Sequence, residues 1–121
     1  MSGIVLKNMT IEFNFSKIEL PHGRIPQSIV KLLEHAVKAL EPSRIILFGS
    51  RATGKAHEKS DFDIAFEFEQ ERENSWYRFL CDANEMPLTL YKRDLINLNN
   101  APVDFKKRIL TEGITIFKNE R

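Results

Sequence analysis

The spacing of apolar residues changes from an alternating to a helical pattern near residue 26. Thr10–Phe15 alternates polar and apolar side chains, which is the period of a half-buried strand. After a breaker at residues 21–23, apolar residues recur at spacings of three and four over Ile29–Leu40, and Pro26 suits the first turn of a helix. The sequence therefore predicts an N-terminal arm over residues 1–25, at a sheet edge or a subunit contact, followed by a helix.

Two apolar segments after this helix have the patterns of strands. Arg44–Phe48 is a continuous apolar run typical of a buried strand. In residues 61–68 every second residue from Phe62 is large and apolar, whereas Asp61, Asp63 and Glu67 share the opposite face. The polar residues 52–60 between them predict a short helix and a loop. We expect the second strand to be anchored by one face and to present carboxylates on the other.

After residue 68, predicted helices and strands continue to alternate along the chain. Ser75 is interpreted as the N-cap of a helix that continues to about Ala83. Residues 87–91 predict a third strand, and Asp94 with the next residue predicts a turn. A helix over residues 103–112 and a strand over 114–117 complete the series. This order predicts one α/β (α+β) domain with a mixed sheet flanked by helices.

Most aromatic and apolar side chains of the last two helices are assigned to the core. Trp76 with Tyr77 could stack on a nucleobase, but packing in the core is favoured. Phe105, Ile109 and Leu110 are expected to face inward. Cys81, the only cysteine, is expected to pack as a small apolar residue, and it excludes an intrachain disulfide.

Length and charge limit the classes of function. The 121 residues allow one domain, predicted over residues 26–118 with a short tail over 119–121. The 18 basic and 17 acidic residues give a net charge of +1, which does not indicate a surface for nucleic acid. The apolar runs are too short to span a bilayer, and residues 1–6 lack the form of a signal peptide. We therefore expect a cytoplasmic protein without a membrane contact.

A glycine and two carboxylates stand at the ends of the two predicted central strands. Gly49-Ser50 follows the first strand, and a residue without a Cβ lets the backbone approach a phosphate closely. Asp61 and Asp63 are two positions apart, so their side chains share one face about 7 Å apart along the strand. Two such carboxylates suit one Mg²⁺ ion. The pattern predicts chemistry on a nucleotide.

The pair of motifs, Gly49-Ser50 and then Asp61 and Asp63 after ten residues, resembles the minimal nucleotidyltransferases of the polymerase-beta type. The likeness covers roughly residues 26–117. It implies that Gly49 and Ser50 hold the β- and γ-phosphates, and that Asp61 and Asp63 bind Mg²⁺. Arg51 and Ser60 are further candidates for nucleotide binding, although Arg51 is equally well explained as a solvated side chain.

The resemblance also implies a reaction and a partner. Such a protein moves a nucleoside monophosphate, most simply AMP from ATP, to an acceptor hydroxyl. Proteins of this type pair with a helical HEPN protein, in which case the nucleotidyltransferase is the antitoxin and the partner a toxin ribonuclease. A homo-oligomer is compatible with the sequence.

The family also has a third carboxylate on the next strand. Aligning the predicted strand over residues 87–91 puts Thr89 or Tyr91 at that position. Asp94 has the opposite parity and lies past the predicted strand, and Glu67 lies about 13 Å along its strand from Asp63. The sequence thus leaves two functions open: an enzyme that transfers slowly, or a catalytically impaired nucleotide-binding module that acts by binding its HEPN-type partner.

Overall fold

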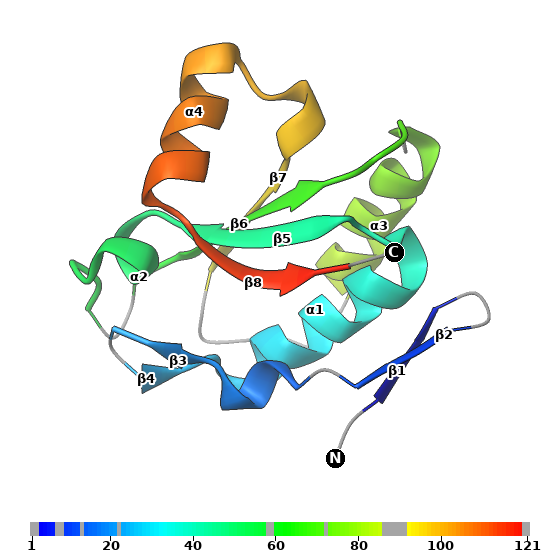
Figure 1. The fold of residues 1–121 in the computed structure, drawn as a ribbon, viewed down its shortest axis with the longest axis horizontal. Helices are drawn as coiled ribbons and strands as arrows, with labels where there is room; N and C mark the ends of the chain where they lie inside the picture. Colours follow the sequence, from blue (N-terminus) through cyan, green and yellow to red (C-terminus); the bar gives the residue numbers. More distant parts are fainter. Residues whose placement is uncertain are drawn as a thin grey trace.

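A four-stranded sheet forms the centre of the molecule. The computed structural model describes residues 3–6, 9–12, 14–21, 23–57, 60–71, 73–85 and 92–119. The sheet has the order β7-β6-β5-β8, with β5 (Arg44–Phe48), β6 (Phe62–Glu67), β7 (Arg93–Asn97) and β8 (Ile114–Lys118) (Figure 1). β5 is antiparallel to β6 and β8, whereas β6 and β7 are parallel. The predicted mixed α/β fold is confirmed.

Helices cover both faces of the sheet. α1 (Gln27–Leu40) and α3 (Glu73–Glu85) lie on one face, and α4 (Val103–Glu112) lies on the other (Figure 1). α2 (Ser50–Thr53) is a single short turn directly after β5. None of the described helices is long and apolar enough to cross a membrane.

The segment before α1 forms two small antiparallel pairs apart from the central sheet. Its strands are β1 (Gly3–Leu6) with β2 (Met9–Glu12), and β3 (Glu19–Leu20) with β4 (Gly23–Arg24). Two 3₁₀ turns are present in the described residues, Phe15–Lys17 and Leu98–Asn100. Phe15 and Ile25 are buried in the same core as α1. The domain limits stay a prediction.

α1 follows directly from the spacing of its apolar residues. Seven of its side chains are buried, at intervals that place them along one side of a helix: Ile29, Val30, Leu32, Leu33, Ala36, Val37 and Leu40. The helix ends at Glu41, which takes a left-handed conformation (φ 48°) and donates its backbone N–H to Val37 O at 3.0 Å. Pro42 then prevents another helical turn. The chain is thereby directed into β5.

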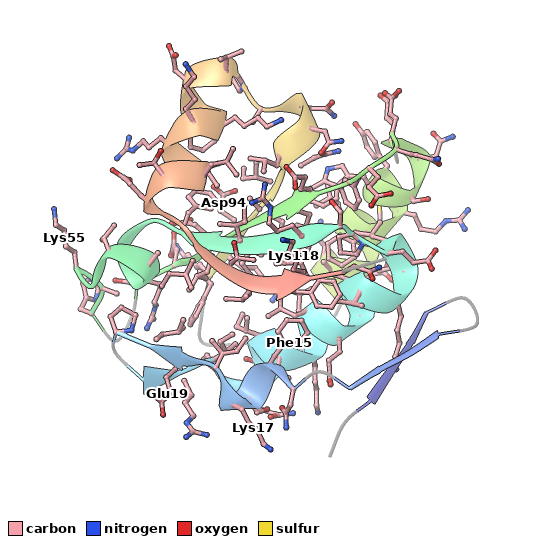
Figure 2. All side chains as sticks on the ribbon, viewed as in Figure 1. Phe15, Lys17, Glu19, Lys55, Asp94 and Lys118 are labelled. Atoms are coloured by element: carbon pink, nitrogen blue, oxygen red, sulfur yellow. The ribbon has the colours of Figure 1, made fainter. Side chains whose placement is uncertain are left out.

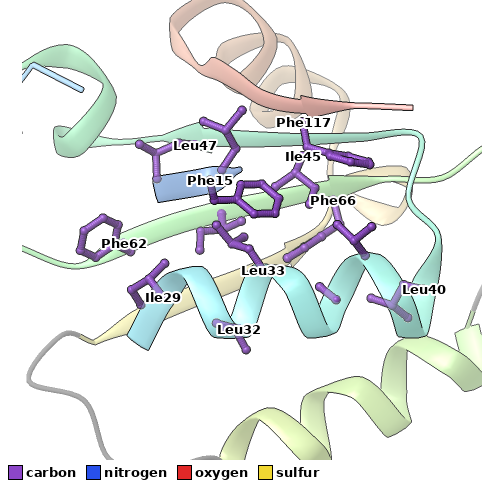
Figure 3. Close-up of a cluster of buried hydrophobic side chains, with 14 of the residues drawn as sticks. Phe15, Ile29, Leu32, Leu33, Leu40, Ile45, Leu47, Phe62, Phe66 and Phe117 are labelled. Atoms are coloured by element: carbon purple, nitrogen blue, oxygen red, sulfur yellow. The ribbon is translucent and has the colours of Figure 1, made fainter. Parts of the chain in front are cut away.

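The sheet separates two buried clusters. The larger lies between the sheet and α1 with α3, and includes Phe15, Phe62 and Phe66 (Figure 3). The smaller, on the α4 face, comprises Ile46, Phe48, Ala65, Leu98 and Ile109. Side chains alternate along a strand, so β6 gives its phenylalanines to the larger cluster and Ala65 to the smaller. Asp63 shares parity with Ala65 and is therefore directed to the α4 face.

Two predicted boundaries are corrected by the structure. α3 begins at Glu73, so Ser75 lies inside the helix and is not its N-cap. Asp94 does not open a turn but lies in β7, because the pairing with β6 extends the chain there. The strand predicted over residues 87–91 lies outside the described residues.

Three inward assignments are also wrong. Cys81 is exposed. Phe105 and Leu110 keep 36% and 40% of their side-chain surface exposed, so Ile109 is the buried residue of α4. The inward assignment of Ile109 is confirmed. Trp76, by contrast, is 9% exposed and packs in the larger cluster, which confirms its assignment to the core.

Candidate active site

The turn after β5 is built around Gly49. Its backbone has φ 73° and ψ −155°, a region that is essentially restricted to glycine. The Gly49 carbonyl accepts the backbone N–H groups of Ala52 and Thr53 at 3.0 and 3.1 Å, which closes α2. The chain therefore turns sharply from the buried strand to present Ser50 at the start of α2.

Gly49 lies against Asp63 on the neighbouring strand. Phe48, the residue before the turn, is the register partner of Asp63. A Cβ atom added to Gly49 would overlap the Asp63 carboxylate oxygen Oδ2. The turn at Gly49 and the carboxylate of Asp63 are thus in direct proximity, and only glycine permits this contact.

Arg51 holds the loop between the two motifs. Its Nη2 and Nε donate to the backbone carbonyl of Ser60 at 2.8 and 3.3 Å, and its guanidinium lies 4.3 Å from the centre of the buried Phe62 ring. The Ser60 hydroxyl accepts the backbone N–H of His57 at 2.9 Å. Neither of the two sequence interpretations of Arg51 anticipated these contacts, which fix the backbone just before Asp61.

Asp94 is brought beside Asp63 by the parallel pairing of β6 and β7. The two residues are register partners in adjacent strands, whose backbones lie about 4.8 Å apart. Their neighbours in the same register, Ala65 and Ile96, both pack on the α4 face, so both carboxylates are directed to that face. Asp94 is labelled in Figure 2. Asp61 precedes the strand with the same parity. Asp63 and Asp94 therefore share one side of the sheet beside Gly49, and Asp61 is near enough for its charge to act on Asp63.

The charges of this group interact. Partial burial raises the pKa of Asp63 from 3.8 to about 6, and the negative charges of Asp94 and Asp61 contribute in the same direction. Removing a carboxylate from water and placing it near like charges both disfavour its ionised form. A bound cation would reverse both effects.

Because the pKa of Asp63 is raised, the free energy of unfolding should depend on pH. Between pH 4 and pH 6 the native state binds a proton at Asp63 that the unfolded chain releases, so stability from this group is lost as the pH rises through 6. Asp63→Asn should therefore melt at a higher temperature than the wild type at pH 8 in EDTA, and the difference should vanish near pH 4. Thermal unfolding of both proteins across this range measures it. A mutant that melts no higher at pH 8 would contradict the raised pKa.

The donor set fits a magnesium ion with nucleotide. In the described part of the chain, no three acidic, histidine or cysteine side chains are placed closely enough to enclose a metal by themselves. Mg²⁺ in phosphoryl-transfer sites uses one or two carboxylates together with substrate phosphates and water, so a preformed cage is not needed. Asp61 and Asp63 together meet this requirement.

Other polar features lie away from this group. Glu67 is paired with Arg44 through two hydrogen bonds of 3.0 Å, so it is engaged at the far end of β6. A cavity of about 330 Å³ lies at that end of β6. It is lined by Ser43, Glu67, Phe68, Glu69, Asn99 and Lys106. This cavity lies at the opposite end of β6 from Asp63, so it is separate from the candidate site.

Sequence reasoning excluded Asp94, which the structure places beside Asp63. The positions it favoured, Thr89 and Tyr91, lie outside the described residues. The exclusion of Asp94 by parity and position is corrected, because β7 starts at Arg93 and places Asp94 in register with Asp63. A signal was present: Asp63-Ile64-Ala65 and Asp94-Leu95-Ile96 each have an aspartate followed by two apolar residues at the start of a strand.

Two solved structures resemble this chain. The chain resembles a crystal structure of a toxin–antitoxin complex with AMP-PNP at 25% identity and a TM-score of 0.54, over 77% of this chain and 73% of the other. A crystal structure of a mutant of the toxin–antitoxin pair MntA–HpeT resembles it in fold, at 22% identity and a TM-score of 0.52, over 76% and 71% of the chains. A search of the curated proteins finds no match.

The family model described as polymerase beta, nucleotidyltransferase, matches residues 27–121, which include the glycine turn and all three carboxylates. The match covers most of the chain and leaves out only the segment before α1. The protein therefore belongs to the polymerase-beta nucleotidyltransferase family and is a nucleotidyltransferase.

Proposed function

We propose that the protein transfers AMP from ATP, with Mg²⁺, to an acceptor hydroxyl, and that it is the antitoxin of a toxin–antitoxin pair. The observation that carries the catalytic part is the register of Asp63 with Asp94 beside the Gly49 turn. Asp94 supplies the carboxylate that the sequence did not reveal. The position of Asp94 favours an active enzyme over a catalytically impaired binding module, because the binding module was considered only for lack of a third carboxylate.

Each residue of the site has a role in this proposal. The backbone of Gly49 and the hydroxyl of Ser50 bind the β- and γ-phosphates. Asp61 and Asp63 would hold the ion, which when bound would supply positive charge to stabilise the negative charge that develops during an in-line displacement. Asp94 accepts the proton of the acceptor hydroxyl while the hydroxyl oxygen forms a bond to the α-phosphorus. The bond between the α-phosphorus and the oxygen that bridges it to the β-phosphate breaks, and pyrophosphate leaves. Arg51 keeps Ser60 and Asp61 in place.

The antitoxin role is supported by a structural neighbour. A toxin–antitoxin complex that contains AMP-PNP shares the fold at 25% identity. The family resemblance suggests a helical HEPN protein as the partner. The net charge of +1 gives no reason to expect a nucleic acid instead. A cytoplasmic location and a homo-oligomer stay predictions.

Thermal unfolding with nucleotide tests the binding part. MgATP should raise the melting temperature of the wild type at pH 7.5, because a ligand that binds only the native state stabilises it by mass action. Asp61→Asn and Asp63→Asn should abolish this increase. The increase must be compared with each variant's own melting temperature without ligand, since Asp63→Asn changes the unliganded protein as well.

A surface carboxylate serves as the control. Glu71 is exposed and lies outside the site, so Glu71→Gln should respond to MgATP as the wild type does. An undiminished increase in the Asp61→Asn, Asp63→Asn double variant would contradict the proposed site. Mass spectrometry of both chains after incubation of a co-expressed partner with MgATP tests the transfer.

A further inference from the structure

A small cavity opens between α4 and the end of β5. Its volume is about 170 Å³, and its lining residues come from both elements: Phe48, Gly49, Phe105, Arg108, Ile109 and Glu112. α4 covers the same face of the sheet to which Asp63 and Asp94 point. Gly49 lines this cavity and also forms the turn beside Asp63, so the cavity adjoins the site.

An exposed aromatic ring forms part of its wall. Phe105 is 36% exposed and meets the ring of Phe48 edge to face, with 5.8 Å between the ring centres. Of the large apolar side chains that are exposed in the described residues, the other aromatic one is Tyr77. Tyr77 belongs to α3, which covers the opposite face of the sheet. Within the described residues, Phe105 is therefore the exposed aromatic side chain on the side of the carboxylates.

A donor and an acceptor stand next to each other at the cavity. Arg108 Nε donates to Glu112 Oε2 at 3.3 Å, and both side chains are accessible, at 73% and 47% exposure. A guanidinium has further N–H donors, and a carboxylate has a second oxygen. The edge of a nucleobase carries donors and acceptors in the same way. A phosphate group, in contrast, would be repelled by Glu112 and would gain nothing from the apolar wall.

We propose that this cavity binds the base of the nucleoside triphosphate, with the ring stacked on Phe105 and its polar edge on Arg108 and Glu112. This inference rests on the proposed function, because it takes the phosphates to lie on the turn at Gly49. The ribose and the α-phosphate separate the base from the β-phosphate, so the base must bind in a hollow within the length of one nucleoside monophosphate of that turn. The cavity meets this condition, and its size suits one planar ring system.

The proposal is tested by comparing the binding of a ligand that carries a base with that of a ligand that has none. Isothermal titration compares MgATP with magnesium tripolyphosphate, which carries the phosphates but no base. Phe105→Ala should weaken MgATP roughly tenfold, the size expected for one lost base–aromatic stack, and leave tripolyphosphate unchanged. Phe105→Tyr keeps the ring and should bind both ligands as the wild type does.

The polar pair gives a second test that leaves the apolar packing intact. Arg108→Ala and Glu112→Gln should change the ratio of dissociation constants among ATP, GTP and CTP without changing that of tripolyphosphate. Lys107, an exposed cation on the same helix that does not line the cavity, provides the control, and Lys107→Ala should leave all these ratios unchanged.

The possible failures are distinguishable. If the wild type binds neither MgATP nor tripolyphosphate, the proposed function fails and the base site fails with it. If the wild type binds both, but Phe105→Ala, Arg108→Ala and Glu112→Gln all bind MgATP normally, the base site alone is overturned. Equal weakening of both ligands by Phe105→Ala would also overturn it, because the ring would then support the phosphate turn and not the base.

Discussion

Replacing Asp94 with asparagine should lower the rate of nucleotidyl transfer by about 10²–10⁴-fold, the usual contribution of a positioned general base. The amide keeps the size of the side chain and its place in β7, but it cannot accept the acceptor's proton. Binding of MgATP should persist, because Asp61 and Asp63 remain. The amount of AMP on the co-expressed partner, followed over time by mass spectrometry, measures the rate.

A second measurement separates this effect from a general disturbance of the site. Removing the charge of Asp94 should lower the pKa of Asp63, since that charge helps to raise it. Asp104, an exposed carboxylate on α4, supplies the control, and Asp104→Asn should transfer at the wild-type rate. Transfer by Asp94→Asn at the wild-type rate would show that Asp94 is not the base.

The sequence predicts those parts of the fold that depend on local periodicity. α1, β5 and β6 were recognised because each has a strong helical or strand pattern over its whole length. Gly49, Asp61 and Asp63 are candidates from the sequence alone because their residue types and spacing carry a chemical meaning without any long-range contact. The structure then adds that Gly49 and Asp63 touch, which depends on the antiparallel pairing of β5 with β6.

Asp94 could not be placed in the same way. β7 is short, and only Leu95 and Ile96 in it are apolar, so its local pattern is weaker than that of residues 87–91. What defines it as a strand is its parallel pairing with β6, a long-range contact. The exposure of Phe105 has a similar origin, because it depends on how much of α4 the sheet covers. Asp94 and Phe105, two of the residues that sequence reasoning misassigned, have central roles in the two proposals.

Replacing Gly49 with alanine should eliminate MgATP binding, because two independent effects act at this position. A side chain is strained at φ 73° and ψ −155°, by about 1–3 kcal/mol. The added Cβ atom would also overlap Oδ2 of Asp63, so the turn or the carboxylate must move away from the other. Gly49→Val should have the same consequence with a larger loss of stability. Isothermal titration with MgATP measures the binding, and thermal unfolding measures the stability.

Gly54 offers a matched control for the strain alone. It ends α2 with φ 84°, and a Cβ atom added there would meet only Pro21 Cβ, at an ordinary 3.6 Å. Gly54→Ala should therefore lower the melting temperature, as Gly49→Ala does, and still bind MgATP. Ser50→Ala should have an intermediate effect, a loss of about 1 kcal/mol of binding free energy for one hydrogen bond to a phosphate. If Gly49→Ala binds MgATP as tightly as Gly54→Ala, the turn does not face the phosphates, and the contact between Gly49 and Asp63 has a structural role only.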